Sequence, residues 1–163
     1  MSVSEKHGAE SALTREEQWH MHRLLARCRK GLEAVMDREL RPFGISAVEL
    51  AILDALSEGK ASGRAATPTE LAAKVVRRHN SVVACLLNME RAGLVSLHKK
   101  SEGRRTMEVE ITPQGEEVYA IAVGTTSRVT EILGALTVNQ RQQLTALLEK
   151  LDQAIVDCLH GVR

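Results

Sequence analysis

The chain has 163 residues, of which 44% are hydrophobic and 26% are charged, and its formal net charge is +1. This length and composition are typical of one globular domain, with or without helical extensions, and allow a buried core. The longest apolar run is the six residues Val82–Leu87, far short of the roughly 18 needed to cross a bilayer. The N-terminus has no apolar stretch of the signal-peptide type. The sequence therefore predicts a cytoplasmic protein without a membrane span.

Histidines and cysteines are the residues that would carry metal or nucleophile chemistry. Cys28, Cys85 and Cys158 are far apart and form no Cys-x-x-Cys pair, so neither a disulfide framework nor a zinc site is indicated. His20 and His22 are two positions apart on a predicted helix and face different directions. The sequence contains no HExxH, no GxSxG and no glycine-rich phosphate loop. We therefore expect no enzyme, no metal site and no cofactor.

Helix starts are marked by the capping box Ser/Thr-x-x-Glu/Gln, in which two side chains satisfy two backbone amide donors. The box begins at Thr14, Ser46, Thr67 and Thr137, and a Thr-Pro pair at Thr112 marks a fifth start. The segment between the second and third helices is rich in small residues and is predicted to be a mobile loop. The expected helices are Thr14–Leu40, Ser46–Ser57, Thr67–Val76, Asn80–Ala92, Pro113–Leu136 and Thr137–His160, and the expected loop is Ser57–Ala66.

Gly93 ends the fourth expected helix, and the residues after it alternate between apolar and polar. Val95 and Leu97 are apolar in the first segment, and Val109 and Ile111 are apolar in the second, with Ser-Glu-Gly-Arg between the two segments. Alternation with period two around a glycine-containing turn predicts a β-hairpin. The predicted fold class is therefore mainly α with a small β-hairpin (α+β).

The third and fourth expected helices, joined by a short turn, have the pattern of a helix-turn-helix. Apolar residues can pack between the two helices, namely Leu71, Ala72, Val75, Val82, Leu86 and Met89. Other residues of the second helix then point elsewhere and are polar or small, namely His79, Asn80, Ser81, Ala84, Asn88 and Arg91. Such side chains suit DNA base edges and phosphates, while Asn80 or Ser81 is expected to cap the helix.

Basic residues are concentrated in one segment, from Arg77 to Arg105. This segment has seven Lys or Arg residues against two Glu, a net charge of +5, so the rest of the chain carries −4. Such asymmetry concentrates the electrostatic field where a polyanion could dock. The hairpin contributes His98, Lys99, Lys100, Arg104 and Arg105, as a basic wing beside a recognition helix would. The alternatives are a solvated face and a dimeric protein-interaction module that binds an acidic partner.

The long terminal helices carry apolar stripes that need a partner surface. On the last helix, Leu144, Leu148, Leu151 and Ile155 have nearly coiled-coil spacing. Further stripes lie on the preceding helix and on the N-terminal helix, namely Ile121, Val129, Ile132, Leu133 and Leu136, and Met21, Leu25, Leu32, Val35 and Met36. We expect an intertwined homodimer. The alternative is a three-helix cap that folds back within one chain.

Three segments, TPTELA, MERAGLV and GRRTMEVEITPQG, resemble the MarR family of winged-helix transcriptional regulators, and the similarity extends from Thr14 to the C-terminus. The resemblance implies a winged helix-turn-helix domain between dimerisation helices, bound as a homodimer to near-palindromic double-stranded DNA. The expected divisions are 1–13, disordered; 14–45, an N-terminal dimerisation helix; 46–112, the winged helix-turn-helix; and 113–163, C-terminal dimerisation helices.

The resemblance also assigns roles to residues of the wing. Arg105 falls on the family's wing arginine, which implies insertion into a minor groove. Gly103 departs from the aspartate that usually braces this arginine, so either Glu102 takes that role or the tip is looser. The expected DNA-binding residues are Thr69, Arg77, Arg78, His79, Asn80, Ser81, Ala84, Asn88, Lys99, Lys100, Arg104 and Arg105.

Regulators of this family respond to a small molecule or to oxidation, and the resemblance implies a ligand pocket between the dimer-forming helices and the winged domain. The expected effector-binding residues are Trp19, His22, Phe43 and Tyr119. We expect a repressor that a small-molecule ligand releases from DNA. The alternative is thiol sensing at Cys28, which has an arginine on either side; a buried, unreactive cysteine is the other interpretation of both Cys28 and Cys85.

Overall fold

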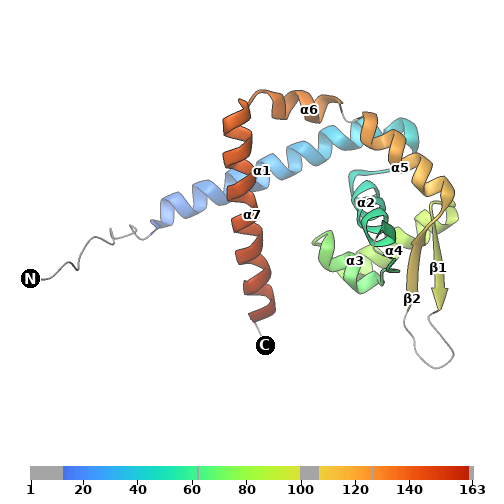
Figure 1. Cartoon of the computed structure of the whole chain (residues 1–163). Coiled ribbons are helices and arrows are strands. Elements are labelled where there is room, and N and C mark those ends of the chain that lie inside the picture. The colour runs from blue at the N-terminus through green and yellow to red at the C-terminus, as the bar shows by residue number, and fades with distance from the viewer. Residues whose placement is uncertain (1–12, 62, 100–106, 126, 162–163) are drawn as a thin grey trace, which may run out of the picture. The chain divides into compact units, whose positions relative to one another are not determined.

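A computed structural model of the chain describes residues 13–61, 63–99, 107–125 and 127–161. The chain divides into two compact units that meet within the first helix, between Ala34 and Val35. The elements, labelled in Figure 1, are α1 (Arg15–Leu40), η1 (Arg41–Phe43), α2 (Ala47–Ala61), α3 (Pro68–Lys74), α4 (His79–Arg91), β1 (Val95–Lys99), β2 (Met107–Ile111), α5 (Pro113–Thr125), α6 (Ser127–Gly134) and α7 (Val138–Gly161). The predicted α+β class with one hairpin is confirmed. Within the described ranges, no helix is both long and apolar enough to span a membrane.

All four predicted capping boxes are present. At the start of α3, the Glu70 amide donates to Thr67 Oγ1 (3.2 Å), and the Thr67 amide donates to Glu70 Oε2 (2.8 Å). Equivalent pairs begin α1, α2 and α7, namely Thr14 with Glu17, Ser46 with Glu49, and Thr137 with Gln140. These starts were predictable because each cap is made within four residues of sequence.

The loop predicted at Ser57–Ala66 is wrong in its first part, because α2 continues to Ala61. Ion pairs to later elements hold this extra turn: Lys60 bonds to Glu116 of α5, and Glu58 bonds to Lys74 of α3. The end of the segment is also ordered. The Ala66 carbonyl accepts a hydrogen bond from the Val109 amide at 2.8 Å, forming an antiparallel bridge to β2.

The single helix predicted at Pro113–Leu136 is wrong, because α5 ends at Thr125 and α6 begins at Ser127. Thr125 Oγ1 donates to the carbonyl oxygen four residues earlier (2.8 Å), a side-chain bond that weakens helix continuation. Glu39, at the end of α1, accepts a hydrogen bond from the Arg128 amide at 2.9 Å. A carboxylate at this position caps a new helix, and sequence periodicity could not reveal a cap from 89 residues away.

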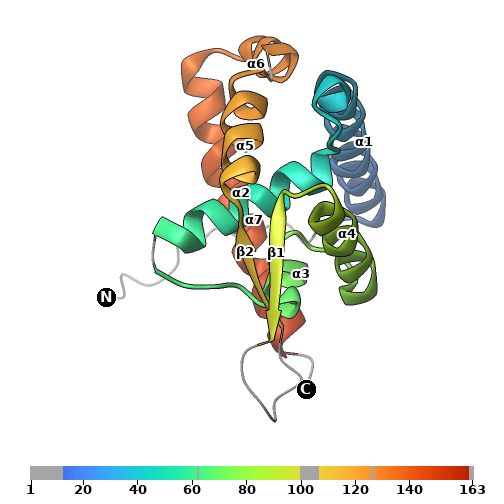
Figure 2. The ribbon, with the colours of Figure 1, turned by 90° about the vertical axis from the view of Figure 1, so that its right-hand side faces the viewer.

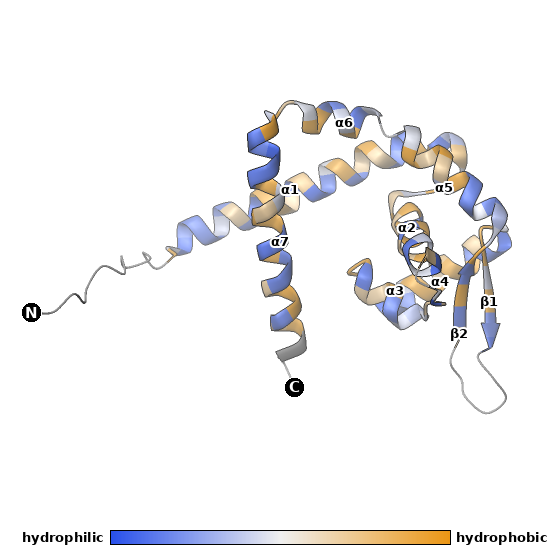
Figure 3. Ribbon diagram, viewed as in Figure 1, coloured by the Kyte–Doolittle hydropathy of each residue, from blue (hydrophilic) through white to orange (hydrophobic). Residues whose placement is uncertain are grey.

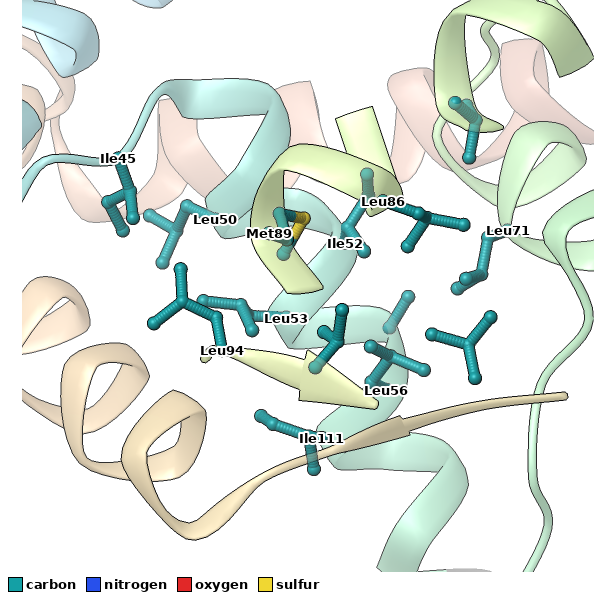
Figure 4. Close-up of a cluster of buried hydrophobic side chains, with 14 of the residues drawn as sticks. Ile45, Leu50, Ile52, Leu53, Leu56, Leu71, Leu86, Met89, Leu94 and Ile111 are labelled. Carbon is teal, nitrogen blue, oxygen red and sulfur yellow. The ribbon is translucent and has the colours of Figure 1, made fainter. Parts of the chain in front are cut away.

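The hydrophobic core lies among α2, α3, α4 and the hairpin, as Figure 4 shows for the side chains it labels. Ile52, Leu53, Met89 and Val109 are fully buried. The predicted packing between α3 and α4 is confirmed, with Val75 half-buried and the other five residues buried, namely Leu71, Ala72, Val82, Leu86 and Met89. This core fixes α4 on one side only, so the opposite face of α4 is open to solvent.

The hairpin pairs in the predicted register. Val95 lies opposite Ile111 and Leu97 lies opposite Val109, in an antiparallel ladder that Figure 2 shows edge-on beside α4. Gly93 ends α4 as predicted: it has φ of +74°, and the Leu94 amide donates to the Met89 carbonyl at 2.9 Å. This is the Schellman arrangement, in which a left-handed glycine redirects the chain. The predicted turn Ser-Glu-Gly-Arg lies outside the described residues.

The Thr-Pro-Gln-Gly segment fastens the start of α5 to the end of α4. Thr112 Oγ1 donates to the Gly93 carbonyl (2.6 Å) and accepts from the Gly115 amide (3.0 Å). A Cβ on Gly115 would lie 2.1 Å from the Leu94 carbonyl oxygen, so only glycine fits this approach. The segment thus anchors the hairpin base to α5 through backbone contacts.

Candidate nucleic-acid interface

One face of α4 is polar and exposed, opposite the face that packs on the core. The fully exposed side chains include five of the predicted DNA-binding residues, His79, Asn80, Ser81, Ala84 and Asn88, together with Arg91. Asn80, Ala84, Asn88 and Arg91 recur at the helical period and therefore project from one side of the helix. The sequence correctly separated the buried stripe of α4 from this face.

The α4 face has two features that the sequence analysis missed. Arg91 Nη1 donates to Asn88 Oδ1 at 3.0 Å, so a guanidinium and an amide are held together on the surface. Leu87, in the apolar run, is 39% exposed beside them, where it could contact a thymine methyl group. The helical spacing of Leu87 from Ala84 and Arg91 was the available signal.

The start of α4 differs from the prediction that Asn80 or Ser81 caps it. The helix begins at His79, its N-cap residue is Arg78, and the Arg78 side chain makes no capping hydrogen bond. Asn80 and Ser81 lie within the first turn, so neither is placed to cap it. Uncapped amides at a helix N-terminus favour an anionic oxygen.

Positive charge lies beside this helix. Arg77 and Arg78 are exposed in the turn before α4, and Lys99 is exposed at the end of β1. Glu90 lies near this group, and its carboxylate accepts a hydrogen bond from the Leu97 amide (3.1 Å), which ties α4 to the hairpin. Thr69, on α3, is also exposed. The predicted wing residues Lys100, Glu102, Gly103, Arg104 and Arg105 lie outside the described residues.

Comparison with solved structures gives many matches to this chain. AbsC from Streptomyces coelicolor, a MarR family transcriptional regulator, is 24% identical with a TM-score of 0.70, covering 91% of this chain and 97% of AbsC. A mutant MarR from E. coli complexed with operator DNA is 19% identical with a TM-score of 0.71, covering 83% and 96%. NadR in complex with 4-hydroxyphenylacetate is 22% identical with a TM-score of 0.66, covering 93% and 97%.

The chain has the MarR-type winged-helix fold. The resemblance drawn from the sequence segments is confirmed at the level of the fold by these matches. No protein-family model and no curated protein matches the chain. The MarR-type fold assigns α3 and α4 to the helix-turn-helix and the β1–β2 hairpin to the wing.

The four predicted effector-binding residues do not form one cluster among the described contacts. Trp19 and His22 meet on α1 with ring centroids 5.6 Å apart, and both are exposed. Phe43 of η1 and Tyr119 of α5 are half-buried against the core of the other unit. The Tyr119 hydroxyl donates to Asp54, and this bond, with burial, raises its pKa to about 12. Tyr119 is therefore a neutral hydrogen-bond donor at physiological pH.

Two hollows lie at the end of α2, and none of these four residues lines either of them. Their volumes are about 260 and 290 Å³. Both include Arg64 and Ala65, which the sequence analysis had placed in a mobile loop. The signal that was available is the pair of cations, Lys60 and Arg64, within that small-residue segment.

The cysteines differ in exposure. Cys28 and Cys158 are exposed, so the expectation of a buried cysteine is wrong for Cys28 in this chain. Cys85 is half-buried on α4, and burial, with a smaller effect of the Glu49 charge, raises its pKa to about 11. A raised pKa disfavours the reactive thiolate at Cys85. No group of three or more His, Cys, Asp or Glu residues suited to a metal occurs in the described part of the chain.

The terminal helices keep their apolar stripes exposed. On α7, Leu144 is 39% exposed, Leu148 45%, Leu151 37% and Ile155 46%. In Figure 3 the hydrophobic colour recurs along α7 between hydrophilic residues. The stripe predicted from the sequence is therefore present as an exposed apolar face.

Proposed function

We propose that this protein is a homodimeric, sequence-specific DNA-binding transcriptional regulator, a repressor released by a small-molecule ligand, and not an enzyme. The observation that carries the proposal is the exposed face of α4, where Asn80, Ser81, Asn88 and Arg91 project away from a core that holds the helix firmly. In the MarR-type fold this is the recognition helix. A neighbour of the same fold is described in complex with operator DNA.

The exposed residues divide into two roles by their chemistry. Asparagine and serine side chains pair with base edges in the major groove, so Asn80, Ser81 and Asn88 would read sequence. Arg77, Arg78 and Lys99 would contact phosphates, which adds affinity for any duplex. Lys100, Arg104 and Arg105 remain predicted phosphate or minor-groove contacts on the wing.

The proposed dimer rests on the exposed face of α7. Contiguous exposed apolar residues at helical spacing mark a partner surface, and a second copy of the chain carries the same stripe. A two-fold dimer predicts two half-sites about 10 base pairs apart. We accordingly retain 14–45 and 113–163 as dimerisation segments, and 46–112 as the DNA-binding domain.

The proposed release by a ligand is supported by a neighbour that is described in complex with 4-hydroxyphenylacetate. The thiol-sensing alternative has weaker support, because the cysteine on the recognition helix, Cys85, is held as a neutral thiol. Cys28 is exposed and keeps the alternative testable. Peroxide-triggered release from DNA that disappears in Cys28→Ser would replace the ligand proposal with the thiol alternative.

Selection of bound duplexes from a random pool tests DNA binding, symmetry and sequence together. Salt titrations on the selected duplex and a scrambled one then separate the two roles. Asn88→Ala should lower the preference for particular base pairs by about 1 to 3 kcal/mol. Lys99→Ala should weaken binding to both duplexes and reduce the salt slope by about 1.

Asn139→Ala on α7 is the matched control, since Asn139 is an exposed asparagine outside the interface. It should leave affinity and salt slope unchanged. Selection without enrichment of any sequence would contradict the proposal. So would unchanged affinity and salt slope in both Asn88→Ala and Lys99→Ala.

A further inference from the structure

The first of the two hollows combines an apolar floor with a charged rim. Leu56 of α2 and Val109 and Ile111 of β2 form the floor, and all three are core residues; Leu56 and Ile111 are labelled in Figure 4. Two cations, Lys60 and Arg64, and one carboxylate, Glu110, line the same hollow. A cavity of about 150 Å³ accepts benzene, so a hollow of about 260 Å³ accommodates a small ring with one polar substituent.

The two cations at this hollow are held by weak, exposed ion pairs. Arg64 Nη2 lies 3.1 Å from Glu70 Oε1, with the two side chains 75% and 50% exposed. Lys60 pairs with Glu116, with the side chains 59% and 42% exposed. Exposed ion pairs contribute little to stability, so an incoming anion can exchange with either carboxylate at small cost.

Glu70 connects this hollow to the helix-turn-helix. Its Oε1 atom pairs with Arg64, while its Oε2 atom accepts from the Thr67 amide (2.8 Å) and from Thr67 Oγ1 (3.0 Å) in the capping box of α3. The chain between Arg64 and Thr67 is short and is fixed at Ala66 by its bridge to Val109. A change in the position of Arg64 therefore acts directly on the first turn of α3.

We propose that this hollow binds a small organic acid, with the apolar body on Leu56, Val109 and Ile111 and the carboxylate on Arg64 and Lys60. The bound anion replaces Glu70 as the partner of Arg64 and alters the cap that begins α3. The hollow is separate from the pocket expected around Trp19, His22, Phe43 and Tyr119. A regulatory consequence of its occupation rests on the proposed DNA-binding function, whereas the binding itself does not.

The test uses the full-length protein and benzoate, a ring with one carboxylate, with benzamide as its neutral counterpart. Backbone amide NMR shifts should change saturably on benzoate addition at Ala65, Ala66, Val109 and Ile111, and also at Glu70. Benzamide should bind about tenfold more weakly or not at all, because it lacks the charge that Arg64 and Lys60 recognise. Arg64→Gln should weaken benzoate binding by about tenfold, the loss expected for one charge-assisted hydrogen bond.

Two further variants separate a site from a general charge effect. Arg29→Gln removes an arginine that is also paired with a glutamate (Arg29 with Glu33, 2.7 Å) and is 57% exposed, and it should bind benzoate like the wild type. Ala65→Leu places a larger side chain in the hollow and should abolish binding while circular dichroism shows an unchanged fold. If Ala65→Leu does not fold, the Arg64→Gln and Arg29→Gln pair decides. Equal binding of benzoate and benzamide, or equal loss in the two arginine variants, would overturn the proposal.

A DNA-binding arm distinguishes failure of the site from failure of the proposed function. With the selected duplex, saturating benzoate should lower the affinity of the wild type but not that of Arg64→Gln. NMR binding without any duplex affinity would retain the site and refute the proposed function. Duplex binding without shifts at the hollow would refute the site and retain the function.

Discussion

Helices α4 and α7 both carry an apolar stripe at helical spacing, but only one stripe is buried by its own chain. Val82, Leu86 and Met89 on α4 are at most 1% exposed, whereas Leu148 and Ile155 on α7 are 45% and 46% exposed. Periodicity predicted both stripes equally well. The difference shows that a pattern identifies the face that must be buried, and that the packing of other elements decides whether the chain itself buries it.

The comparison is tested most strongly by placing a charge on the α7 stripe. We expect the wild type to have twice the chain mass of 17.9 kDa in solution, and Leu148→Lys to have the mass of a single chain. Each lost leucine removes about 1.5 to 3 kcal/mol of apolar burial, and a two-fold interface loses it twice. Sedimentation equilibrium measures the mass.

The control for this prediction is Gln142→Lys, because Gln142 lies on the opposite side of α7 from the leucine stripe. Gln142→Lys should keep the mass of the wild type. A wild type that is already a single chain, or a Leu148→Lys protein that remains a dimer, would favour the three-helix cap within one chain.

Removing a side chain from the α4 stripe should instead lower the stability of the chain itself. Leu86 is 1% exposed and Leu87, its neighbour, is 39% exposed. Leu86→Ala should lower the free energy of unfolding by about 3 kcal/mol, through lost burial and a residual cavity. Leu87→Ala should lower it by less than about 1 kcal/mol. Urea titration followed by circular dichroism compares them, and equal losses would mean that α4 is not oriented as described.

The same contrast between core and surface explains what could be predicted from the sequence. Thr67 with Glu70, and the other capping boxes, were predictable because each forms within one turn. The end of α2 at Ala61 was not, because Lys60 is held by Glu116, 56 residues later. The break before Ser127 was missed for the same reason, since its cap comes from Glu39.

The candidate site followed the same rule. The exposed face of α4 was predictable, because helical geometry alone assigns Asn80 and Asn88 to one side once the buried stripe is known. The hollow beside Arg64 was not, because its floor is formed by strand and helix residues that meet only in the fold. The predicted cap at Asn80 or Ser81 was wrong because α4 begins earlier, at His79.

Cysteine reactivity extends the comparison to the thiol on α4. Burial raises the pKa of Cys85 from 9.0 to about 11, so its thiolate fraction at pH 8 should be about 100-fold lower than in the unfolded chain. Alkylation by iodoacetamide should slow by a similar factor. Mass spectrometry of labelled peptides, with the protein in guanidinium as the control, measures the rates. Labelling of Cys85 at its denatured rate would show that α4 does not bury it.

The sign of the related pH effect follows from the same shift. Below pH 9, Cys85 is a neutral thiol in both states, so it adds no pH dependence to stability. Between pH 9 and about 11 the unfolded chain loses this proton first, and the contribution of Cys85 to stability falls as the pH rises. Cys85→Ala should remove that part of the alkaline decline.

The smallest predicted effect concerns the turn between α3 and α4, where the well-packed region contains an unfavourable backbone conformation. Val76 has a φ of +50° and is 71% exposed. The left-handed region costs a residue with a Cβ about 1 to 2 kcal/mol and is especially unfavourable for a β-branched side chain. Glycine relieves this strain but costs about 0.5 to 1 kcal/mol in chain entropy. Little apolar burial is lost, because the side chain is exposed.

Val76→Gly should therefore raise the free energy of unfolding by about 0.5 to 1 kcal/mol, the difference between these two effects. Val75→Gly is the matched control. Val75 has a φ of −89° and packs partly against the core, so glycine there brings the entropic cost and loses burial without relieving strain. Urea titration of both variants should shift the midpoint up for Val76→Gly and down for Val75→Gly. Shifts in the same downward direction would mean that Val76 does not adopt the left-handed conformation in solution, and that the turn is as relaxed as the core it joins.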